Sequence, residues 1–301
     1  MSGQGKGCGL LDFPEAFRKT FNEISKRVDG GFIDKLVLRS EIDGNEKKYI
    51  IEVPMLQFVG EFHRGNGCEI VFDAKWGTHS KVVEYYTSAE QAACEWLLDT
   101  IHSGRCFFTN IEMEMISSKN ITIEDTNGVV NALDINVTDD NIHEKSLLES
   151  WIERFTNGVG LLRINSTSEE AYHFSEGFEI AEGHLQLKGR FVIPLDVLLQ
   201  INAKKIMFED YSESSNINED YIVGILENWL NRVEKPKTIT FVANFEGSDI
   251  GEKVFEQINA IFVRDNELPG TWFHNIPKKN AKITFCHNGN NFEMKIYDSR
   301  E

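Results

Sequence analysis

Several features that would assign this 301-residue chain to a specific class of protein are missing from its sequence. Its five cysteines are scattered and form no CxxC pair, which disfavours a disulfide framework and a zinc knuckle. Its six prolines and 23 glycines exclude a collagenous or proline-rich chain. No segment has the apolar core of a signal peptide or approaches the roughly 20 apolar residues of a membrane span. We therefore expect a cytoplasmic or nuclear protein that does not bind membranes.

Sequence motifs of common enzymes are missing too. No GxGxxG or GxxxxGK[ST] phosphate loop, no GxSxG elbow and no HExxH pair occurs. His63 and Cys68 could be a nucleophile pair, but residues 64–67 between them have the composition of a turn between strands. The eight histidines have no zinc-ligand spacing. The sequence thus predicts no catalytic residue, no cofactor and no metal site.

The composition predicts a folded and acidic protein. Hydrophobic residues make up 41% of the chain and charged residues 26%, which is enough to bury a core in one large or two small domains. The net charge is −17, and residues 111–230 hold most of it, with 22 acidic and 8 basic groups. A negative surface repels phosphate backbones, so we expect no nucleic-acid partner. The acidic region either keeps the protein soluble or attracts a basic protein partner.

Hydrophobic spacing divides the chain into three regions: 1–29, 30–108 and 109–301. In the first, residues 10–28 have the pattern of an amphipathic helix that ends at Gly30-Gly31. The second is β-rich, with a predicted hairpin of residues 33–39 and 48–53, a strand at 68–74 and a helix at 88–102.

The third region contains an internal repeat. Leu148-Glu-Ser-Trp151 matches Leu226-Glu-Asn-Trp229 at an offset of 78 residues. Each copy has the order strand, polar loop, amphipathic helix and strand. The strands of the first copy are predicted at 132–137 and 160–164, and those of the second copy at 205–209 and 238–242. A weaker copy contains Trp96. Such units bury their apolar faces by stacking, so we predict parallel strands with buried Trp151 and Trp229.

The chain ends in the clearest hairpin signal, in which residues 282–286 and 292–297 alternate around an Asn/Gly turn. The predicted fold class is therefore α/β. We expect an irregular leucine-rich-repeat-like β/α array with a mixed β-rich N-terminal region and a C-terminal β-hairpin.

Residues 217–231 resemble the helix of nematode F-box-associated domains, in which an Asn/Asp-rich start leads to a Trp-Ile/Leu element. The strand at 237–242 and the closing hairpin are similar to the same family, and the Trp96 and Trp151 segments resemble its FTH-type region. The resemblance covers roughly residues 90–300. It implies a substrate-recognition role in cullin-RING ubiquitin ligases.

Members of that family commonly carry an N-terminal F-box that docks on a Skp-type adaptor. Here only Leu11, Phe13, Pro14 and Phe17 resemble the start of an F-box. Because a strand pattern begins by Ile33, the two further helices of an F-box are not predicted, and we expect no tight adaptor binding.

Two classes of function follow from the sequence. The first is a non-catalytic protein–protein interaction module, and the alternative is an α/β enzyme whose active-site residues are dispersed. For the first class, acidic loops after two predicted strands are candidates to bind a basic partner: Asp139, Asp140, Glu209, Asp210 and Glu213. Those residues could instead be turn formers and helix caps, or could bind a cation.

Overall fold

The computed structural model describes residues 32–44, 46–65, 67–74, 77–83, 88–102, 107–114, 130–138, 159–174, 183–210, 217–231, 237–243, 251–276, 281–288 and 291–298. The chain divides into two compact units, the first formed by residues 1–111 and 117–122 and the second by residues 112–116 and 123–301. It passes from the first unit to the second within strand β6 (Phe107–Glu114). The helix predicted at 10–28 and the helix predicted around Trp151 lie outside the described residues.

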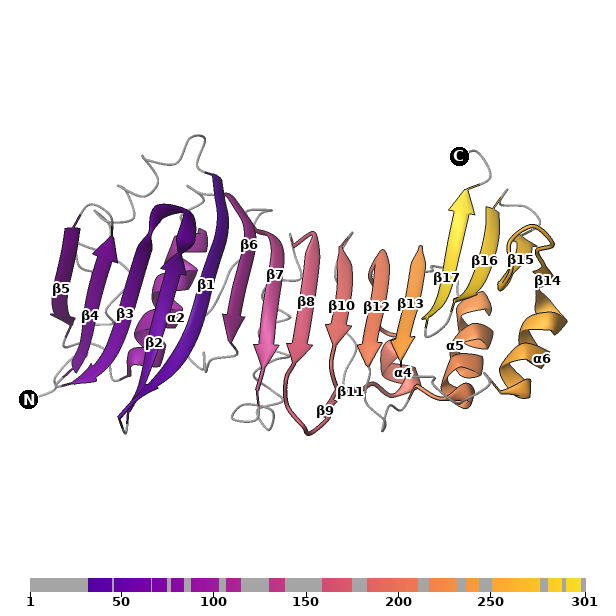
Figure 1. The fold of residues 1–301 in the computed structure, drawn as a ribbon, viewed down its shortest axis with the longest axis horizontal. Coiled ribbons are helices and arrows are strands. Elements are labelled where there is room, and N and C mark those ends of the chain that lie inside the picture. The colour runs from indigo at the N-terminus through magenta and orange to yellow at the C-terminus, as the bar shows by residue number, and fades with distance from the viewer. Residues whose placement is uncertain are drawn as a thin grey trace, which may run out of the picture. The chain divides into compact units, whose positions relative to one another are not determined.

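The first unit contains an antiparallel sheet in which five strands pair in chain order (Figure 1). They are β1 (Phe32–Asp43), β2 (Glu46–Val53), β3 (Phe58–Gly65), β4 (Gly67–Ala74) and β5 (Gly77–Val83), with a short 3-10 helix, η3 (Pro54–Leu56), between β2 and β3. The predicted β1–β2 hairpin is confirmed, and Gly44 in its turn has a φ of 65°. His63 and Cys68 lie on the antiparallel strands β3 and β4, and Arg64, Gly65 and Gly67 between them belong to these strands as well.

One helix, α2 (Ala89–His102), packs on this antiparallel sheet against β2, β3 and β4. It begins after Ser88, whose Oγ accepts a hydrogen bond from the backbone N–H of Gln91 at 3.1 Å. On the buried side, Trp96 stacks on Phe58 with ring centroids 5.8 Å apart. The predicted helix at 88–102 is thus confirmed, and its apolar stripe holds it on the sheet.

The second unit contains a mixed sheet whose parallel half has five strands, β7 to β13. These are β7 (Val130–Val137), β8 (Leu161–Ser166), β10 (His184–Lys188), β12 (Lys205–Asp210) and β13 (Thr238–Ala243). Four antiparallel strands follow β13 across the sheet: β17 (Asn291–Asp298), β16 (Ala281–Asn288), β15 (Thr271–Ile276) and β14 (Val263–Arg264). The predicted parallel strands and the predicted C-terminal hairpin, β16–β17, are confirmed.

Helix α5 (Glu219–Asn231) covers part of the apolar face of this mixed sheet. Asn218 caps it, because its Oδ1 accepts a hydrogen bond from the backbone N–H of Tyr221 at 3.0 Å. The buried side of the helix ends in Trp229, which is completely buried, as the repeat predicted. A tryptophan buried in this way anchors the helix on the strands beneath it.

A further described helix, α6 (Glu252–Ile261), packs against β15. Trp272 of β15 donates a hydrogen bond from Nε1 to Oδ1 of Asn259 at 3.0 Å, and Phe255 lies beside its ring. This helix was not predicted from the sequence. It extends the helical layer over the antiparallel half of the sheet.

Over the residues that it describes, the structure confirms a mixed α/β protein that is rich in strands and has few helices. A regular repeat of strand and helix is not confirmed. Among the described residues of the second unit, strand–helix–strand order with a long helix occurs in β12–α5–β13. The connection from β10 to β12 instead contains β11 (Phe191–Val192), which pairs with β9 (Tyr172–His173), and the four-residue helix α4 (Leu195–Leu198).

Candidate protein-binding surface

The two faces of the parallel strands differ in polarity. Side chains such as those of Ile135, Ile164 and Phe208 point to the covered face and are buried, whereas their neighbours along each strand are mostly polar and half-buried. The apolar exceptions on this second face are Ala132, Leu161, Met207 and Val242. Parallel strands with helices on both faces are apolar on both sides, so this alternation indicates a face without helices. We call it the open face, and its central residues are Asp134, Asn136, Arg163, Asn165, His184, Gln186, Lys205, Met207, Glu209 and Thr240.

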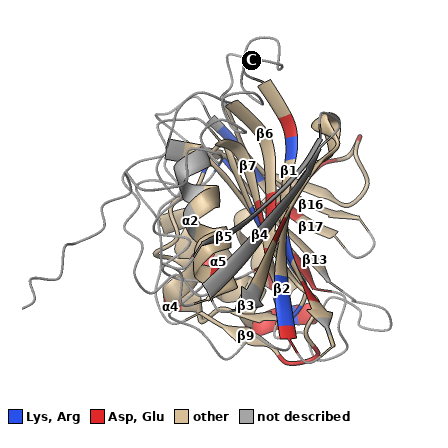
Figure 2. Ribbon diagram, turned by 90° about the vertical axis from the view of Figure 1, so that its left-hand side faces the viewer, with Lys and Arg blue, Asp and Glu red and all other residues tan. Residues whose placement is uncertain are grey.

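The helices described in the second unit lie on the covered face. Tyr221 of α5 packs edge-on against Phe241, and Phe255 of α6 packs against Trp272, both covered-face residues. Helix α4 packs on α5. Figure 2 shows α4 and α5 on the same side of the strands. The open face therefore presents side chains, and not a helical layer, in the part of this unit that the structure describes.

An ion pair joins the first two strands of the open face. Nη1 of Arg163 donates hydrogen bonds to both carboxylate oxygens of Asp134, at 2.7 and 2.9 Å. The Asp134 side chain is 13% exposed and that of Arg163 is 34% exposed. The carboxylate is thus largely shielded from water, and the guanidinium remains accessible at the surface.

Amide side chains connect further positions of the open face. Asn165 Nδ2 donates to Asn136 Oδ1 at 3.2 Å, and Asn136 Nδ2 donates to Glu112 Oε1 at 3.4 Å. On the next strands, Gln186 Nε2 donates to Glu209 Oε1 at 2.7 Å. These contacts hold polar side chains in fixed positions before any partner binds.

The amino-terminal row of the open face is basic. The strand register places His184 beside Lys205, and Thr238 lies between Lys205 and Lys295. Partial burial, followed by the positive charges of Lys205 and Lys204, lowers the pKa of His184. The imidazole is therefore neutral at pH 7, and the positive charge of this row is carried by lysines.

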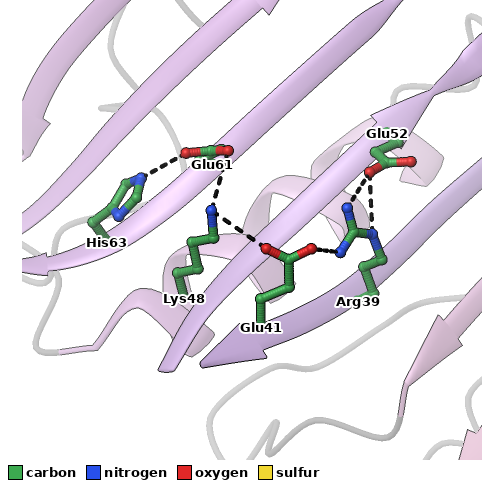
Figure 3. Close-up of polar contacts among 6 residues, drawn as sticks. All are labelled: Arg39, Glu41, Lys48, Glu52, Glu61 and His63. Carbon is green, nitrogen blue, oxygen red and sulfur yellow. Dashed lines mark hydrogen bonds and ion pairs between the residues drawn. The ribbon is translucent and has the colours of Figure 1, made fainter. Parts of the chain in front are cut away.

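The first unit has a charged network on the face of its sheet opposite α2 (Figure 3). Arg39 on β1 binds Glu41 and Glu52, with its Nε 3.1 Å and its Nη2 2.6 Å from Glu52 Oε1. Lys48 on β2 continues the network, since its Nζ lies 3.4 Å from both Glu41 Oε2 and Glu61 Oε1. The network ends at His63, whose Nε2 lies 3.0 Å from Glu61 Oε2. The hydrogen bond from Arg39 lowers the pKa of the Glu41 carboxyl.

The structure describes only two of the five acidic residues predicted to bind a partner, Glu209 and Asp210. Asp210 is 5% exposed and points to the covered face, and Glu209 accepts the hydrogen bond from Gln186 on the open face. Asp139, Asp140 and Glu213 lie outside the described residues, as do the predicted adaptor contacts Leu11, Phe13, Pro14 and Phe17. The described part of the acidic rim therefore offers one partly exposed carboxylate.

The described residues include no group of three or more His, Cys, Asp or Glu side chains that could hold a metal ion. None of the described helices is long and apolar enough to cross a membrane. Two described cysteines are free thiols, the buried Cys94 and the half-buried Cys286.

The sequence interpretation missed the polar contacts of the open face. Their signal is alternation within each strand, such as Leu133-Asp134-Ile135 and Leu185-Gln186-Leu187. The first segment lies in the strand predicted at 132–137, whereas no strand was predicted at 185–187. Their regular polar positions also indicate a sheet with one uncovered face.

No protein-family model matches this chain, and neither a curated protein nor a solved structure matches it.

Proposed function

We propose that this chain is a non-catalytic protein–protein interaction module whose partner binds the open face of the second unit. The observation that carries the proposal is the one-sided sheet, in which the described helices pack on one face and ordered polar side chains occupy the other. Catalysis needs a nucleophile, base or metal in mutual reach, and the open-face contacts are instead ion pairs and amide hydrogen bonds.

The dimensions of the open face suit a protein partner. Eight strands, from β7 to β15, lie side by side in this unit. At about 4.8 Å between strands and about 3.3 Å per residue, six-residue strands give a projected area of roughly 700 Å². A stable protein interface buries about 800 Å² on each partner. The face is thus large enough for an interface of ordinary size.

The order of the open-face side chains also favours binding. Side chains that must be immobilised on association cost about 0.5–1.5 kcal/mol each. Arg163, Asn165 and Gln186 are already held by neighbouring strands through hydrogen bonds. This part of the entropic cost is therefore met during folding.

The resemblance to F-box-associated domains supports a more specific role. We propose that the parallel strands act in the manner of a leucine-rich-repeat-like array in a substrate-recognition subunit of a cullin-RING ubiquitin ligase. The bound protein would then be a substrate for ubiquitin transfer, while the incomplete F-box motif at Leu11–Phe17 argues for weak or no direct binding of the Skp-type adaptor.

Affinity purification with two matched arginine substitutions tests the proposal. Met207→Arg places a long charged side chain in the middle of the open face, and Glu227→Arg places the same side chain on the exposed side of α5. We expect Met207→Arg to lose the proteins that the wild-type chain retains, whereas Glu227→Arg keeps them. Retention by Met207→Arg, or loss by both folded variants, would contradict binding on the open face.

A further inference from the structure

Lysines gather at the amino-terminal ends of β10, β12 and β13 in the second unit. The backbone N–H of Lys204 donates to the carbonyl of Gly183 at 2.8 Å, and that of Lys237 donates to the carbonyl of Lys204 at 2.7 Å. The next bond in the series joins the N–H of Ile296 to the carbonyl of Lys237 at 2.9 Å. These hydrogen bonds hold the amino-terminal ends of β10, β12 and β13 beside one another and beside the carboxy-terminal end of β17.

We define the amino-end lysine cluster as Lys204, Lys205, Lys237 and Lys295. The first three are exposed, and Lys295 is half-buried. Lys295 pairs with Glu293 on its own strand. In the part of the chain that the structure describes, neither Lys205 nor Lys237 forms an ion pair with a carboxylate. The cluster therefore has positive charge that the described residues only partly neutralise.

The positive charge of this edge is opposite in sign to the net charge of the chain, which is −17. Neighbouring strands lie about 4.8 Å apart, so like charges at their ends repel each other. The effect reaches His184, whose pKa the nearby lysines help to lower. A negatively charged group placed against the cluster would relieve this repulsion.

We propose that the amino-end lysine cluster binds an acidic, Asp- or Glu-rich segment of the protein partner. This inference rests on the proposed function, because the cluster borders the open face on which the partner binds. His184, Lys205 and Lys295 belong to the same row of that face, which allows one bound segment to contact both regions.

The spacing of the strands sets the length of the acidic segment. Three strand intervals separate β10 from β17, a distance of about 14 Å. An extended segment rises about 3.3 Å per residue, so about five residues cross the cluster. Alternate side chains point the same way, which gives two or three carboxylates facing the lysines.

The total charge of the chain favours a short acidic peptide over a nucleic acid. The screening length is about 8 Å at physiological ionic strength, so a few carboxylates interact mainly with the local lysines. A long polyanion would extend over a protein with a net charge of −17 and be repelled by it. The local attraction is therefore selective for a short anionic segment.

A fluorescein-labelled eight-residue peptide of alternating Glu and Ser, titrated by anisotropy, tests the inference. We expect it to bind the wild-type chain more tightly than the peptide with Gln in place of Glu, and to weaken as NaCl rises from about 0.05 to 0.3 M. The double variant Lys205→Gln/Lys237→Gln should lose about tenfold in affinity. Lys205→Arg/Lys237→Arg should restore it.

The charge-matched control is Lys188→Gln/Lys253→Gln, which removes one lysine at the opposite end of β10 and one on α6, and should change the affinity less than about twofold. Equal binding of the two peptides, equal losses in both Gln variants, or tighter binding of a single-stranded oligonucleotide of the same charge would overturn the inference. If the peptide fails while Met207→Arg still abolishes partner retention, the proposed function stands and only the acidic chemistry of the partner is wrong.

Discussion

Arg163 Nη1 lies within hydrogen-bond distance of both carboxylate oxygens of Asp134, at 2.7 and 2.9 Å, on neighbouring parallel strands. One guanidinium nitrogen thus compensates a carboxylate that is 13% exposed. This contact crosses the open face and fixes two of its charged side chains relative to each other.

Removing the guanidinium should destabilise the protein, because the Asp134 carboxylate would lose its charged donor while still mostly shielded from water. We expect Arg163→Ala to lower the free energy of unfolding by about 1–3 kcal/mol. A double-mutant cycle with Asp134→Ala, measured by urea denaturation, should give a coupling free energy of at least about 0.5 kcal/mol. Strictly additive effects would show that the ion pair does not contribute.

Trp229→Ala should be among the most destabilising substitutions in α5. The side chain is completely buried, so its loss removes contacts and leaves a cavity that costs about 3–5 kcal/mol. Glu227→Ala, two residues earlier and exposed, is the control and should change stability by less than about 0.5 kcal/mol. Similar unfolding midpoints for the two variants would contradict the packing of α5.

Two glycines with positive φ should respond differently to alanine. Gly189 has a φ of 112°, and a Cβ there would lie 2.3 Å from the carbonyl oxygen of Ser166. Gly44 has a φ of 65°, and a Cβ there would meet nothing within 4 Å. Gly44→Ala should therefore cost about 1–2 kcal/mol from backbone strain alone. Gly189→Ala should lower the free energy of unfolding clearly more than Gly44→Ala does. A smaller loss of stability for Gly189→Ala in thermal unfolding would contradict the close approach of Gly189, the residue after β10, to Ser166.

Tyr221 should make stability sensitive to alkaline pH. Its hydroxyl donates to the carbonyl of Ile193 at 2.9 Å, and burial raises its pKa. The unfolded chain loses this proton near pH 10, before the folded protein does. The contribution to stability is thus present below about pH 10 and is lost as pH rises above it.

The matching variant is Tyr221→Phe, which removes the ionisable hydroxyl. This variant should lower the free energy of unfolding by about 0.5–1.5 kcal/mol at pH 7. Its free energy of unfolding should also fall less steeply than that of the wild type between about pH 10 and 11. Parallel stability curves for Tyr221→Phe and wild type across that range would exclude this role.

The network of the first unit can be tested through Glu41. The hydrogen bond from Arg39 holds the pKa of the Glu41 carboxyl below its usual range. A carbon-13 NMR titration of this carboxyl should show that lowered pKa in the wild type and a return toward the usual value in Arg39→Gln. The same midpoint in both proteins would mean that the contact does not persist in solution.

The sequence predicted the local elements well where apolar spacing was regular. In β12 the apolar residues Ile206 and Phe208 alternate with the residues of the other face, and the apolar stripe of α5 that ends at Trp229 follows. The strand, the helix and the burial of Trp229 could therefore be predicted from the sequence. The helix at Glu252–Ile261 was missed, since only two of its residues, Val254 and Ile258, are buried. A stripe this sparse is a weak periodic signal.

The contacts of the open face could not be predicted, because they depend on strand order and register. Asp134 and Arg163 are 29 positions apart in sequence and meet only because β7 and β8 pair in one particular alignment. The acidic loops show the converse problem. Asp210 follows the predicted strand and was expected at an exposed rim, but the pleat of β12 turns it to the covered face, where it is buried.

Site-specific photo-crosslinking tests binding on the open face most directly. A photoreactive amino acid at Met207 faces the solvent side of the sheet, and the same group at Glu227 faces solvent from α5 on the other side. With the partner retained by the wild-type chain, we predict a covalent adduct from position 207 and none above background from position 227. An adduct formed equally from both positions, or only from position 227, would contradict the open face as the binding surface.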